Sequence, residues 1–489
     1  MHYHLIGIAG TAMASLAGLL RAKGHRVTGS DEGVYPPMSD LLDELGIAYA
    51  PAYDPANLEP APDVVVVGNA VSRGNEELEA VLDRGLVYTS AAATLKEELL
   101  RGRHVLAVAG THGKTTTTSL LAWILERAGL EPSFLVGGVA ENFGSSFRLT
   151  DSELFVIEAD EYDTAYFDKG PKMWHYLPRT AVVTNVEFDH ADIYRDDVAY
   201  RFAFERFVNL VPRSGTLVLG WDSPDARALA GRSWAPVESF ALDGPDGGAE
   251  GGAASASAAT HPRWTARDVA YDAKGTTFRI LRDGRDADPR GETFRMPLAG
   301  AFNVRNALAA VAAARAVGAS WEGIREGLAT FRSVRRRMEV RGEVDGVLVI
   351  DDFAHHPTAV RETLEAARGR WAGRRLVAVF EPRSYTAQRR EFQEAFRRAL
   401  AAADRVVLAG LFRPERYDET TGMDPDALVA GLVADGVPAA YVPEVDDIVE
   451  RVAGEARAGD VVLVMSNGGF GGIHQKLLAR LERRAGSGG

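Results

Sequence analysis

A short glycine-containing loop carries the strongest chemical signal of this sequence. The stretch VAGTHGKTTTT begins at Val108, and its Gly110 and Gly113 allow backbone NH groups to turn inward around phosphate oxygens. Lys114 adds a mobile cation, and Thr115 can offer its hydroxyl to Mg²⁺. The common pattern GxxxxGK(S/T) requires a glycine at the position of Val108. The stretch therefore predicts nucleotide-phosphate binding by a shortened loop, although a Gly-Lys-Thr turn can also simply begin a helix.

Acidic residues follow two later strand-like runs. Residues 158–161, EADE, close a run that ends at Glu158, and residues 187–190, EFDH, follow a run that ends at Asn185. Because ligands of open α/β sheets gather at the carboxyl ends of strands, we expect both groups to lie near the loop. Carboxylates are ligands that Mg²⁺ prefers. The two groups predict a metal site beside the phosphates; the alternative is that they are solvated strand ends.

These groups must be positioned by strands and helices, which alternate along almost the whole chain. We expect strands over 3–8, 26–29, 63–68, 104–109, 154–158, 181–185, 346–350, 376–380, 405–408 and 460–465, and helices over 12–23, 75–84, 115–128, 303–317 and 472–483. The alternation is typical of parallel sheets covered by helices. The predicted fold class is α/β with three domains: a Rossmann-like N-terminal domain, a central P-loop ATPase-type parallel sheet and a Rossmann-like C-terminal domain.

The expected domain boundaries are 1–98, 99–332 and 333–489, in keeping with a chain of 489 residues at roughly 150 residues per domain. Residues 243–262 read DGPDGGAEGGAASASAATHP and offer too few apolar groups to pack. We expect them to form a flexible insert on the surface of the central domain.

The composition narrows the possible functions. A formal net charge of −13 argues against a general nucleic-acid or membrane-surface binder, because most of the surface would repel phosphates. The chain has no cysteine, which excludes disulfides, thiolate metal sites and a thiol nucleophile. We find no signal-peptide pattern and no run of about 18 apolar residues. We therefore expect a soluble cytoplasmic protein with no nucleic-acid or membrane partner.

A second glycine-containing turn lies near the N-terminus. Residues 7–12, GIAGTA, resemble the dinucleotide fingerprint GxGxxG, with Ala9 and Ala12 at its second and third glycine positions, and Asp31 ends the next strand-like run. Taken alone, this turn favours an NAD-dependent oxidoreductase. Such an enzyme, however, has no use for a phosphate loop a hundred residues later.

Two adjacent histidines, His355 and His356, lie in the stretch DDFAHHP after a third-domain strand. They are consistent with ordinary loop residues or with a zinc site that lacks further obvious ligands. Because acidic neighbours precede them and the stretch is expected to face the phosphate loop, we favour ribose binding or substrate positioning. The glycine-dense stretch 466–472, SNGGFGG, permits either close approach of backbone to a ligand or a tight turn.

Six motifs together resemble the Mur ligase family of ATP-dependent, amide-bond-forming enzymes of bacterial peptidoglycan metabolism. They are GTHGKT at 110–115, EADEYD at 158–163, TNVEFDHAD at 184–192, GAFNVRNALAA at 300–310, RRRMEVRGE at 335–343 and DDFAHHPT at 351–358. The family has its own phosphate loop, GxxGK(S/T), which accounts for the absence of a glycine at position 108.

The resemblance implies a set of cofactor residues. The implied ATP contacts are Gly110, Thr111, His112, Gly113, Lys114, Thr115, Thr116, Asn303, Asn306, Arg337 and Asp351. The implied Mg²⁺ ligands are Thr115, Glu158 and His190, with Mn²⁺ as a substitute, and the implied catalytic residues are Lys114, Glu158 and His190. ATP would phosphorylate a carboxylate of the substrate, and an amine would then attack the acyl phosphate.

Within the family, the first domain resembles the branch that binds UDP-N-acetylmuramic acid. The implied substrate residues are Gly10, Thr11, Ala12, Met13, Asp31, Asn69, His356, Arg383 and Ser384. Two acceptors compete: L-alanine and the murein tripeptide L-alanyl-γ-D-glutamyl-meso-diaminopimelate. The stretches VYPPMS at 34–39, GNAVSRGN at 68–75, EPRS at 381–384 and VMSNGGFGGIHQKLL at 464–478 favour the tripeptide. We expect a monomer or weak homodimer.

Two positions depart from the pattern of many relatives. Phe302 stands where many carry histidine, so a polar contact to adenine would be replaced by an aromatic surface. Several branches use a carbamylated lysine about fifteen residues after the histidine of the DH motif, and no lysine lies between His190 and Leu210. The absence of that lysine agrees with the branch that binds UDP-N-acetylmuramic acid.

Overall fold

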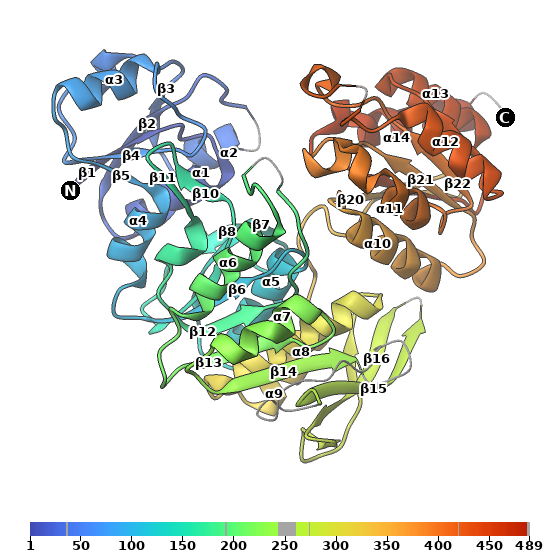
Figure 1. Cartoon of the computed structure of the whole chain (residues 1–489), viewed down its shortest axis with the longest axis horizontal. Coiled ribbons are helices and arrows are strands. Elements are labelled where there is room, and N and C mark those ends of the chain that lie inside the picture. Colours follow the sequence, from blue (N-terminus) through green and yellow to red (C-terminus); the bar gives the residue numbers. More distant parts are fainter. Residues whose placement is uncertain (36–37, 191–192, 243–260, 273, 419, 487–489) are drawn as a thin grey trace.

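A computed structural model describes residues 1–35, 38–190, 193–242, 261–272, 274–418 and 420–486. Three main sheets, each accompanied by helices, follow one another along the chain, from the blue N-terminal part through the green and yellow centre to the red C-terminal part (Figure 1). The α/β fold class is as predicted. The predicted insert at 243–262 falls mainly on 243–260, which lies outside the described residues. Among the described residues, no helix is long and apolar enough to cross a membrane.

The N-terminal sheet has five parallel strands in the order β3-β2-β1-β4-β5. Its strands are β1 (His2–Ile6), β2 (Arg26–Ser30), β3 (Ala48–Ala50), β4 (Val64–Val67) and β5 (Tyr88–Ser90). Its helices are α1 (Thr11–Ala22), α2 (Met38–Glu44), η1 (Pro55–Leu58), α3 (Glu76–Asp83), α4 (Ala91–Leu95) and η2 (Lys96–Leu100). Asn75 caps α3 through its side chain, so the predicted start of this helix marks the cap.

The central sheet contains eleven strands, and its main path runs β17-β16-β15-β14-β13-β12-β6-β9-β7-β8, with β18 paired to β16. These strands are β6 (His104–Ala109), β7 (Ser133–Ala140), β8 (Ser145–Arg148), β9 (Leu154–Glu158), β12 (Pro178–Val183), β13 (Thr216–Gly220), β14 (Val237–Leu242), β15 (Trp264–Asp272), β16 (Gly275–Arg282), β17 (Arg285–Asp286) and β18 (Phe294–Met296). A separate hairpin joins β10 (Asp163–Ala165) to β11 (Asp168–Pro171). The helices are α5 (Lys114–Arg127), η3 (Lys172–His175), α6 (Asp197–Val208), α7 (Pro224–Ala228), η4 (Leu229–Arg232), α8 (Ala301–Ala316) and α9 (Trp321–Thr330).

The middle of this sheet is parallel, as predicted, but both of its ends are antiparallel. β8 pairs with β7, and β16 pairs with β15, β17 and β18, in antiparallel register. The strands at the β15 end were not predicted. The second half of β15 is mostly exposed and interrupts its apolar residues with Arg267, Asp268 and Asp272, so it lacks the continuous apolar run that marks a buried strand.

The C-terminal sheet has the order β19-β20-β24-β21-β22-β23, in which only the β19–β20 pair is antiparallel. Its strands are β19 (Glu339–Val344), β20 (Val347–Asp352), β21 (Leu376–Phe380), β22 (Arg405–Leu408), β23 (Ala439–Tyr441) and β24 (Val461–Met465). Its helices are α10 (Pro357–Arg370), η5 (Thr386–Gln388), α11 (Arg390–Leu400), η6 (Pro414–Arg416), α12 (Pro425–Ala434), α13 (Val445–Glu455), η7 (Phe470–Gly472) and α14 (Ile473–Gly486).

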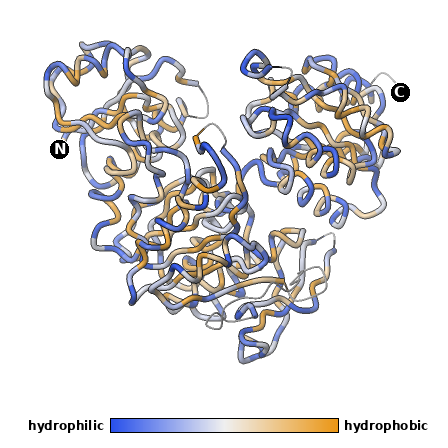
Figure 2. Tube along the Cα trace, in the orientation of Figure 1, coloured by the Kyte–Doolittle hydropathy of each residue, from blue (hydrophilic) through white to orange (hydrophobic). Residues whose placement is uncertain are grey.

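A shared hydrophobic core joins the N-terminal and central domains, but the C-terminal domain has separate hydrophobic cores. One cluster contains residues of both the N-terminal and the central sheet, and a Cβ at Gly18 in α1 would lie 2.1 Å from Cζ of Phe147 in β8. The two clusters of the C-terminal domain contain only residues between 338 and 481. Figure 2 shows apolar chain concentrated within each body of the molecule. The first two domains therefore pack against each other through apolar contacts, whereas the hydrophobic clusters of the C-terminal domain contain only residues of that domain.

Candidate functional site

The predicted phosphate loop leads from β6 into α5. Gly110 has a φ of 134° and Gly113 a φ of 81°, a region that favours glycine. A Cβ at Gly113 would lie 2.4 Å from Oδ1 of Asn306, and one at Gly110 would lie 2.1 Å from Oγ1 of Thr184. Both positions therefore require glycine. Since α5 begins at Lys114, its free N-terminal NH groups lie at the loop, as phosphate binding requires.

Lys114 reaches back across the loop to a buried carboxylate. Its Nζ donates hydrogen bonds to the carbonyl oxygen of Gly110 at 2.6 Å and to Oε1 of Glu161 at 2.8 Å. The side chain of Glu161 is completely buried. Burial acts to lower the pKa of Lys114, but the charge of Glu161 raises it above its ordinary value. A charged ammonium is therefore held where phosphates would approach.

Thr115 and Glu158 lie together where α5 begins and β9 ends. The hydroxyl of Thr115 donates to Oε1 of Glu158 at 2.9 Å, and the backbone NH of Gly137 donates to Oε2 at 2.7 Å. Burial raises the pKa of Glu158. A hydroxyl and a carboxylate are both oxygen ligands, and a divalent cation would offset the cost of a buried negative charge. The pair therefore fits a Mg²⁺ ion.

His190 lies beside a different carboxylate from the one the sequence suggested. Its Nε2 is 3.2 Å from Oε1 of Glu161, and its backbone φ of 55° is in the left-handed region. Burial acts to lower the pKa of His190, whereas the charge of Asp189 raises it. Glu161 therefore contacts both His190 and Lys114. Glu161 was not among the predicted site residues, although it is the third acidic residue of the EADE group.

The start of α8 forms the wall behind the loop. Nδ2 of Asn303 donates to the carbonyl oxygen of Ala299 at 2.7 Å, and Nδ2 of Asn306 donates to Oδ1 of Asn303 at 3.4 Å. Both asparagines are buried, and Phe302 lines the same cavity. The wall thus offers amide groups and an aromatic ring, the groups that a purine base can contact.

The C-terminal domain forms the opposite wall. Arg337 lines the cavity, and its guanidinium lies 5.1 Å from the centre of the Phe353 ring. Asp351, one of the implied ATP contacts, is outside the cavity lining. Its carboxylate lies 3.3 Å from Nε of Arg336 and 3.4 Å from Nε2 of His474. These contacts tie Asp351 to other segments of its own domain.

One cavity of about 710 Å³ brings these walls together between the central and C-terminal domains. The predicted site residues that line it are Thr11, Thr111, His112, Gly113, Lys114, Thr115, Thr116, Glu158, His190, Asn303, Asn306 and Arg337. Those outside its lining are Gly10, Ala12, Met13, Asp31, Asn69, Gly110, Asp351, His356, Arg383 and Ser384. The cavity therefore unites most of the expected ATP and metal residues and only one expected substrate residue.

The expected UDP-sugar residues gather at the carboxyl end of the N-terminal sheet. Gly10 is the N-cap of α1 and makes no side-chain cap, which leaves the first NH groups of this helix available. Oδ2 of Asp31 accepts a hydrogen bond from the NH of Ala9 at 2.9 Å. Nδ2 of Asn69 donates to Oδ1 of Asp163 in the central domain at 3.1 Å. These residues therefore form a second polar region, at the junction of the first two domains.

Arg383 and Ser384, the expected peptide contacts, follow β21. The guanidinium of Arg383 lies 3.9 Å from the centre of the Phe412 ring, and its Nη1 lies 3.5 Å from Oε1 of Glu381. Oγ of Ser384 accepts a hydrogen bond from the NH of Ala387 at 3.0 Å. The Arg383 side chain is 32% exposed, so it retains a surface that a ligand can reach.

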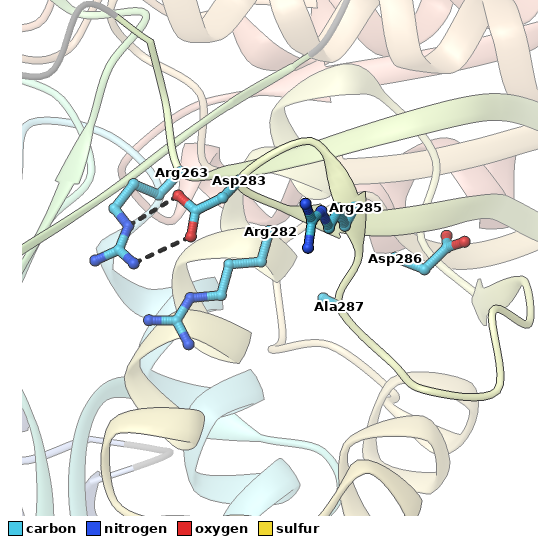
Figure 3. A pocket seen from close by; sticks show the side chains of 6 residues that line it. All are labelled: Arg263, Arg282, Asp283, Arg285, Asp286 and Ala287. Atoms are coloured by element: carbon cyan, nitrogen blue, oxygen red, sulfur yellow. Dashed lines mark hydrogen bonds and ion pairs between the residues drawn. The ribbon is translucent and has the colours of Figure 1, made fainter.

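A second pocket lies at the β15–β17 end of the central sheet (Figure 3). Arg263 donates from Nε and Nη2 to the two carboxylate oxygens of Asp283, each at 3.1 Å. Arg282 pairs with Glu238 at 2.8 Å. Because these guanidinium groups are already paired with carboxylates, we place the chemistry at the interdomain cavity.

Three family signatures match the chain in succession. The signature described as "Mur ligase family, catalytic domain" matches residues 2–103, "Mur ligase middle domain" matches 108–314, and "Mur ligase, glutamate ligase domain" matches 336–468. The chain belongs to the Mur ligase family. The resemblance that the sequence motifs indicated is confirmed.

Individual relatives cover the whole chain. The UDP-N-acetylmuramate–L-alanyl-γ-D-glutamyl-meso-2,6-diaminoheptandioate ligase of Escherichia coli (strain K12) is 43% identical over 489 residues, 99% of each chain. A crystal structure of a murein peptide ligase from Psychrobacter arcticus 273-4 superposes with a TM-score of 0.72 at 38% identity and covers 99% of each chain. A UDP-N-acetylmuramate–L-alanine ligase of Burkholderia ambifaria is 36% identical over 489 residues, 99% of this chain and 98% of that protein.

Proposed function

We propose that this chain is an ATP-dependent amide ligase that joins the tripeptide L-alanyl-γ-D-glutamyl-meso-diaminopimelate to UDP-N-acetylmuramic acid. The observation that carries the proposal is the placement of Lys114 and Thr115 at the start of α5, beside Glu158 at the end of β9, inside a cavity between two domains. The printed name of the E. coli relative specifies this tripeptide and this sugar nucleotide. Family, fold and site chemistry therefore lead to one reaction.

The reaction has two steps. The γ-phosphoryl group of ATP moves to an oxygen of the lactyl carboxylate, which gives an acyl phosphate and ADP. The free α-amine of the tripeptide then attacks the acyl carbon, the C–O bond to phosphate breaks, and the amine loses a proton as the amide forms. Activation is needed because a carboxylate is a poor electrophile.

Lys114 and the first NH groups of α5 lower the repulsion between the two anions that must meet in the first step. The ammonium is positioned by Glu161 at one side and by the carbonyl oxygen of Gly110 at the other. Positioned positive charge supplies most of the rate in phosphoryl transfer. Glu161 is therefore a positioning residue in this proposal, since it acts through Lys114 and His190.

We propose that Thr115 and Glu158 hold one Mg²⁺ and that Glu158 and His190 hold a second, for which Mn²⁺ substitutes because imidazole suits it better. When bound, the ions neutralise phosphate charge. Asn303, Asn306 and Phe302 would surround adenine, with Arg337 on the phosphates. The lining of the cavity by all four residues supports this placement.

For the other substrates we propose contacts outside this cavity. The pyrophosphate of the UDP-sugar would lie at the turn before α1, near Asp31 and Asn69, because free helix NH groups favour anions. Arg383 and Ser384 would contact a carboxylate of the tripeptide, for which a guanidinium is well suited. We also propose that the three domains comprise residues 1–98, 99–332 and 333–489.

Two alternatives are less well supported. A UDP-N-acetylmuramate:L-alanine ligase would share the family and the site, but the stretches EPRS at 381–384 and SNGGFGGIH at 466–474 favour the tripeptide. The identities of 43% and 36% to the two kinds of relative agree with this choice. An NAD-dependent oxidoreductase is not supported, because the family match extends through all three domains.

The acyl-phosphate step can be tested with UDP-N-acetylmuramic acid that carries ¹⁸O in its lactyl carboxylate. The proposal predicts that one ¹⁸O per turnover appears in the released phosphate, because the oxygen that accepts the phosphoryl group leaves with it. Phosphate free of ¹⁸O, with amide product formed, would contradict the proposed route.

A further inference from the structure

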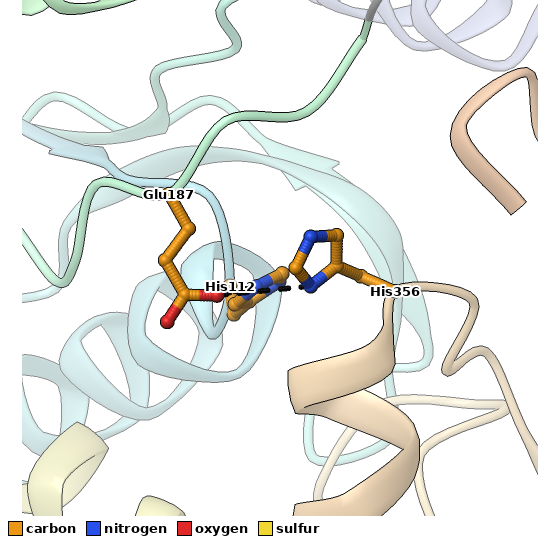
Figure 4. Close-up of side chains that lie close together, drawn as sticks. All are labelled: His112, Glu187 and His356. Carbon is orange, nitrogen blue, oxygen red and sulfur yellow. Dashed lines mark hydrogen bonds and ion pairs between the residues drawn. The ribbon is translucent and has the colours of Figure 1, made fainter. Parts of the chain in front are cut away.

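A cluster of two histidines and one carboxylate lies where the central and C-terminal domains meet (Figure 4). His112 belongs to the phosphate loop, Glu187 to the segment after β12, and His356 is the N-cap of α10. Nε2 of His112 is 3.1 Å from Oε2 of Glu187, and Nδ1 of His356 is 3.7 Å from the same oxygen. Three segments far apart in the sequence therefore aim their side chains at one point.

The functions assigned so far do not explain why these three side chains lie together. Those functions are phosphate binding by the loop and Mg²⁺ binding by Thr115 and Glu158. His356 is 5% exposed, and its Nε2 has no hydrogen-bond partner among the described residues. Its Nδ1 accepts only a long hydrogen bond, 3.4 Å, from the NH of Thr358. A buried imidazole with so few partners is costly unless a ligand completes its environment.

The spacing of the three groups suits a small transition-metal ion. Zinc binds imidazole nitrogen at about 2.0–2.1 Å and carboxylate oxygen at about 2.0–2.2 Å, so tetrahedral ligands lie about 3.3 Å apart. The two observed separations to Oε2 of Glu187, 3.1 and 3.7 Å, bracket that value, and all three ligand atoms lie within 4.8 Å of one another. Small side-chain movements would complete the geometry.

The protonation states also suit a cation. Burial lowers the pKa of His356, so its imidazole is neutral near pH 7 and Nδ1 can present a lone pair. Although burial acts to raise the pKa of Glu187, its hydrogen bond with His112 lowers it, so this residue is a carboxylate. Binding through Nε2 of His112 would replace the hydrogen bond of this nitrogen with Glu187.

We propose that His112, Glu187 and His356 form a binding site for one divalent transition-metal ion of the Zn²⁺ class, separate from the Mg²⁺ site at Thr115 and Glu158. Two imidazoles and one carboxylate leave a fourth position for water or a ligand, and nitrogen donors select such ions over Mg²⁺. Since His356 belongs to the C-terminal domain and the other two residues to the central domain, the bound ion links the domains at the phosphate loop.

Co²⁺ is the probe for the test, because its visible absorption reports nitrogen ligands and tetrahedral geometry. The full-length protein, without nucleotide, sugar or peptide, is titrated with Co²⁺ in excess Mg²⁺, and bound Co²⁺ is counted by equilibrium dialysis. We expect a tetrahedral absorption band that saturates with one Co²⁺, and displacement of that Co²⁺ by Zn²⁺. Because no substrate is present, the result is independent of the proposed ligase activity.

Substitutions of the proposed ligands test where the ion binds. Glu187→Gln, which preserves shape, and His356→Ala should each weaken Co²⁺ binding at least about tenfold and abolish the band. His175→Ala removes a histidine that pairs with one carboxylate, Asp168, at 2.9 Å, and should leave the band unchanged. His190→Gln should also retain it, because His190 belongs to the other metal site. Circular dichroism establishes that each variant is folded; if His356→Ala is not, Glu187→Gln decides the test.

Two results would overturn the proposal. The first is a wild-type titration that gives no tetrahedral band. The second is a band that persists in Glu187→Gln; if that band is also lost in His190→Gln, the Co²⁺ is bound at the Mg²⁺ site.

Discussion

The ammonium nitrogen of Lys114 lies 2.7 Å from Oε2 of Glu161, a carboxylate that is completely buried. Oε1 of the same carboxylate lies 3.2 Å from Nε2 of His190. One acidic side chain thus contacts both the cation of the phosphate loop and an expected metal ligand. In this protein the geometry of the loop depends on Glu161 as well as on the glycines that shape it.

Replacing Glu161 with glutamine should reduce kcat by about 100-fold, because a neutral amide cannot hold the ammonium of Lys114 or orient His190. Steady-state phosphate release at saturating substrates measures the change. Glu126→Gln is the matched control, since Glu126 lies on α5 and pairs with Arg148 at 2.6 Å, away from the loop. A Glu161→Gln enzyme with kcat within twofold of wild type would show that the pair has no role in catalysis.

Removal of Lys114 should abolish phosphate release, but Lys114→Ala alone also leaves Glu161 as a buried, unpaired charge. Breaking a buried pair in this way costs about 3–5 kcal/mol of stability. The double variant Lys114→Met/Glu161→Gln removes both charges, so we expect it to fold better than Lys114→Ala and to be equally inactive. Thermal unfolding and activity assays of the three proteins separate the two effects; an active double variant would exclude a catalytic role for Lys114.

Gly113→Ala should lose ATP binding. The new Cβ would lie 2.4 Å from Oδ1 of Asn306 and would hold alanine at a φ of 81°. Gly129→Ala introduces similar backbone strain, about 1–2 kcal/mol, at a φ of 75° but meets no atom within 4 Å. Calorimetry with a non-hydrolysable ATP analogue should therefore show normal affinity for Gly129→Ala only. Equal affinities in the two variants would mean that the loop tolerates a side chain.

Thr115→Val should raise the Mg²⁺ concentration needed for half-maximal activity by about tenfold or more, because it removes an oxygen ligand and the hydrogen bond to Glu158. Thr115→Ser retains the hydroxyl and should behave like the wild type. Activity measured across a Mg²⁺ titration at saturating ATP gives the comparison. An unchanged requirement in Thr115→Val would remove Thr115 from the metal site.

Glu98 should make stability depend on pH below about 4.5. Burial acts to raise its pKa, but hydrogen bonds from Lys23, Tyr3 and His25 lower it from 4.5 to about 2. Between these values the unfolded chain binds a proton that the native protein does not, so this contribution is complete above pH 4.5 and is lost as the pH falls towards 2.

Glu98→Gln should therefore cost on the order of 1–3 kcal/mol at pH 7, and the difference from wild type should shrink between pH 4.5 and 2. Urea unfolding at several pH values measures it. Glu97→Gln, which removes a more exposed pair with Arg101, should have a smaller effect. A difference that stays constant down to pH 2 would contradict the assigned cause.

The parts of the fold that the sequence predicted best are its buried parallel strands. β6, β9, β21 and β22 have the predicted bounds, and each contains a continuous buried apolar run. β15 was missed because its outer half is exposed and carries no such run. Strand prediction therefore succeeded where burial on both faces fixes the composition.

The site residues also differ in how well the sequence predicted them. Lys114 and Thr115 could be assigned because the loop motif is local in the sequence. The contact of His190 with Glu161, and the approach of His356 to Glu187, depend on how separate segments and domains pack. A single sequence contains the residues of these contacts but no periodicity or spacing that pairs them.

The choice of acceptor tests the proposed ligase activity most directly. With ATP and UDP-N-acetylmuramic acid saturating, kcat/KM is measured by phosphate release with the tripeptide L-alanyl-γ-D-glutamyl-meso-diaminopimelate and, separately, with L-alanine. We expect kcat/KM to be about 100-fold or more higher for the tripeptide, because only the tripeptide has carboxylates beyond its first residue that Arg383 can contact. An equal or higher kcat/KM for L-alanine would contradict it.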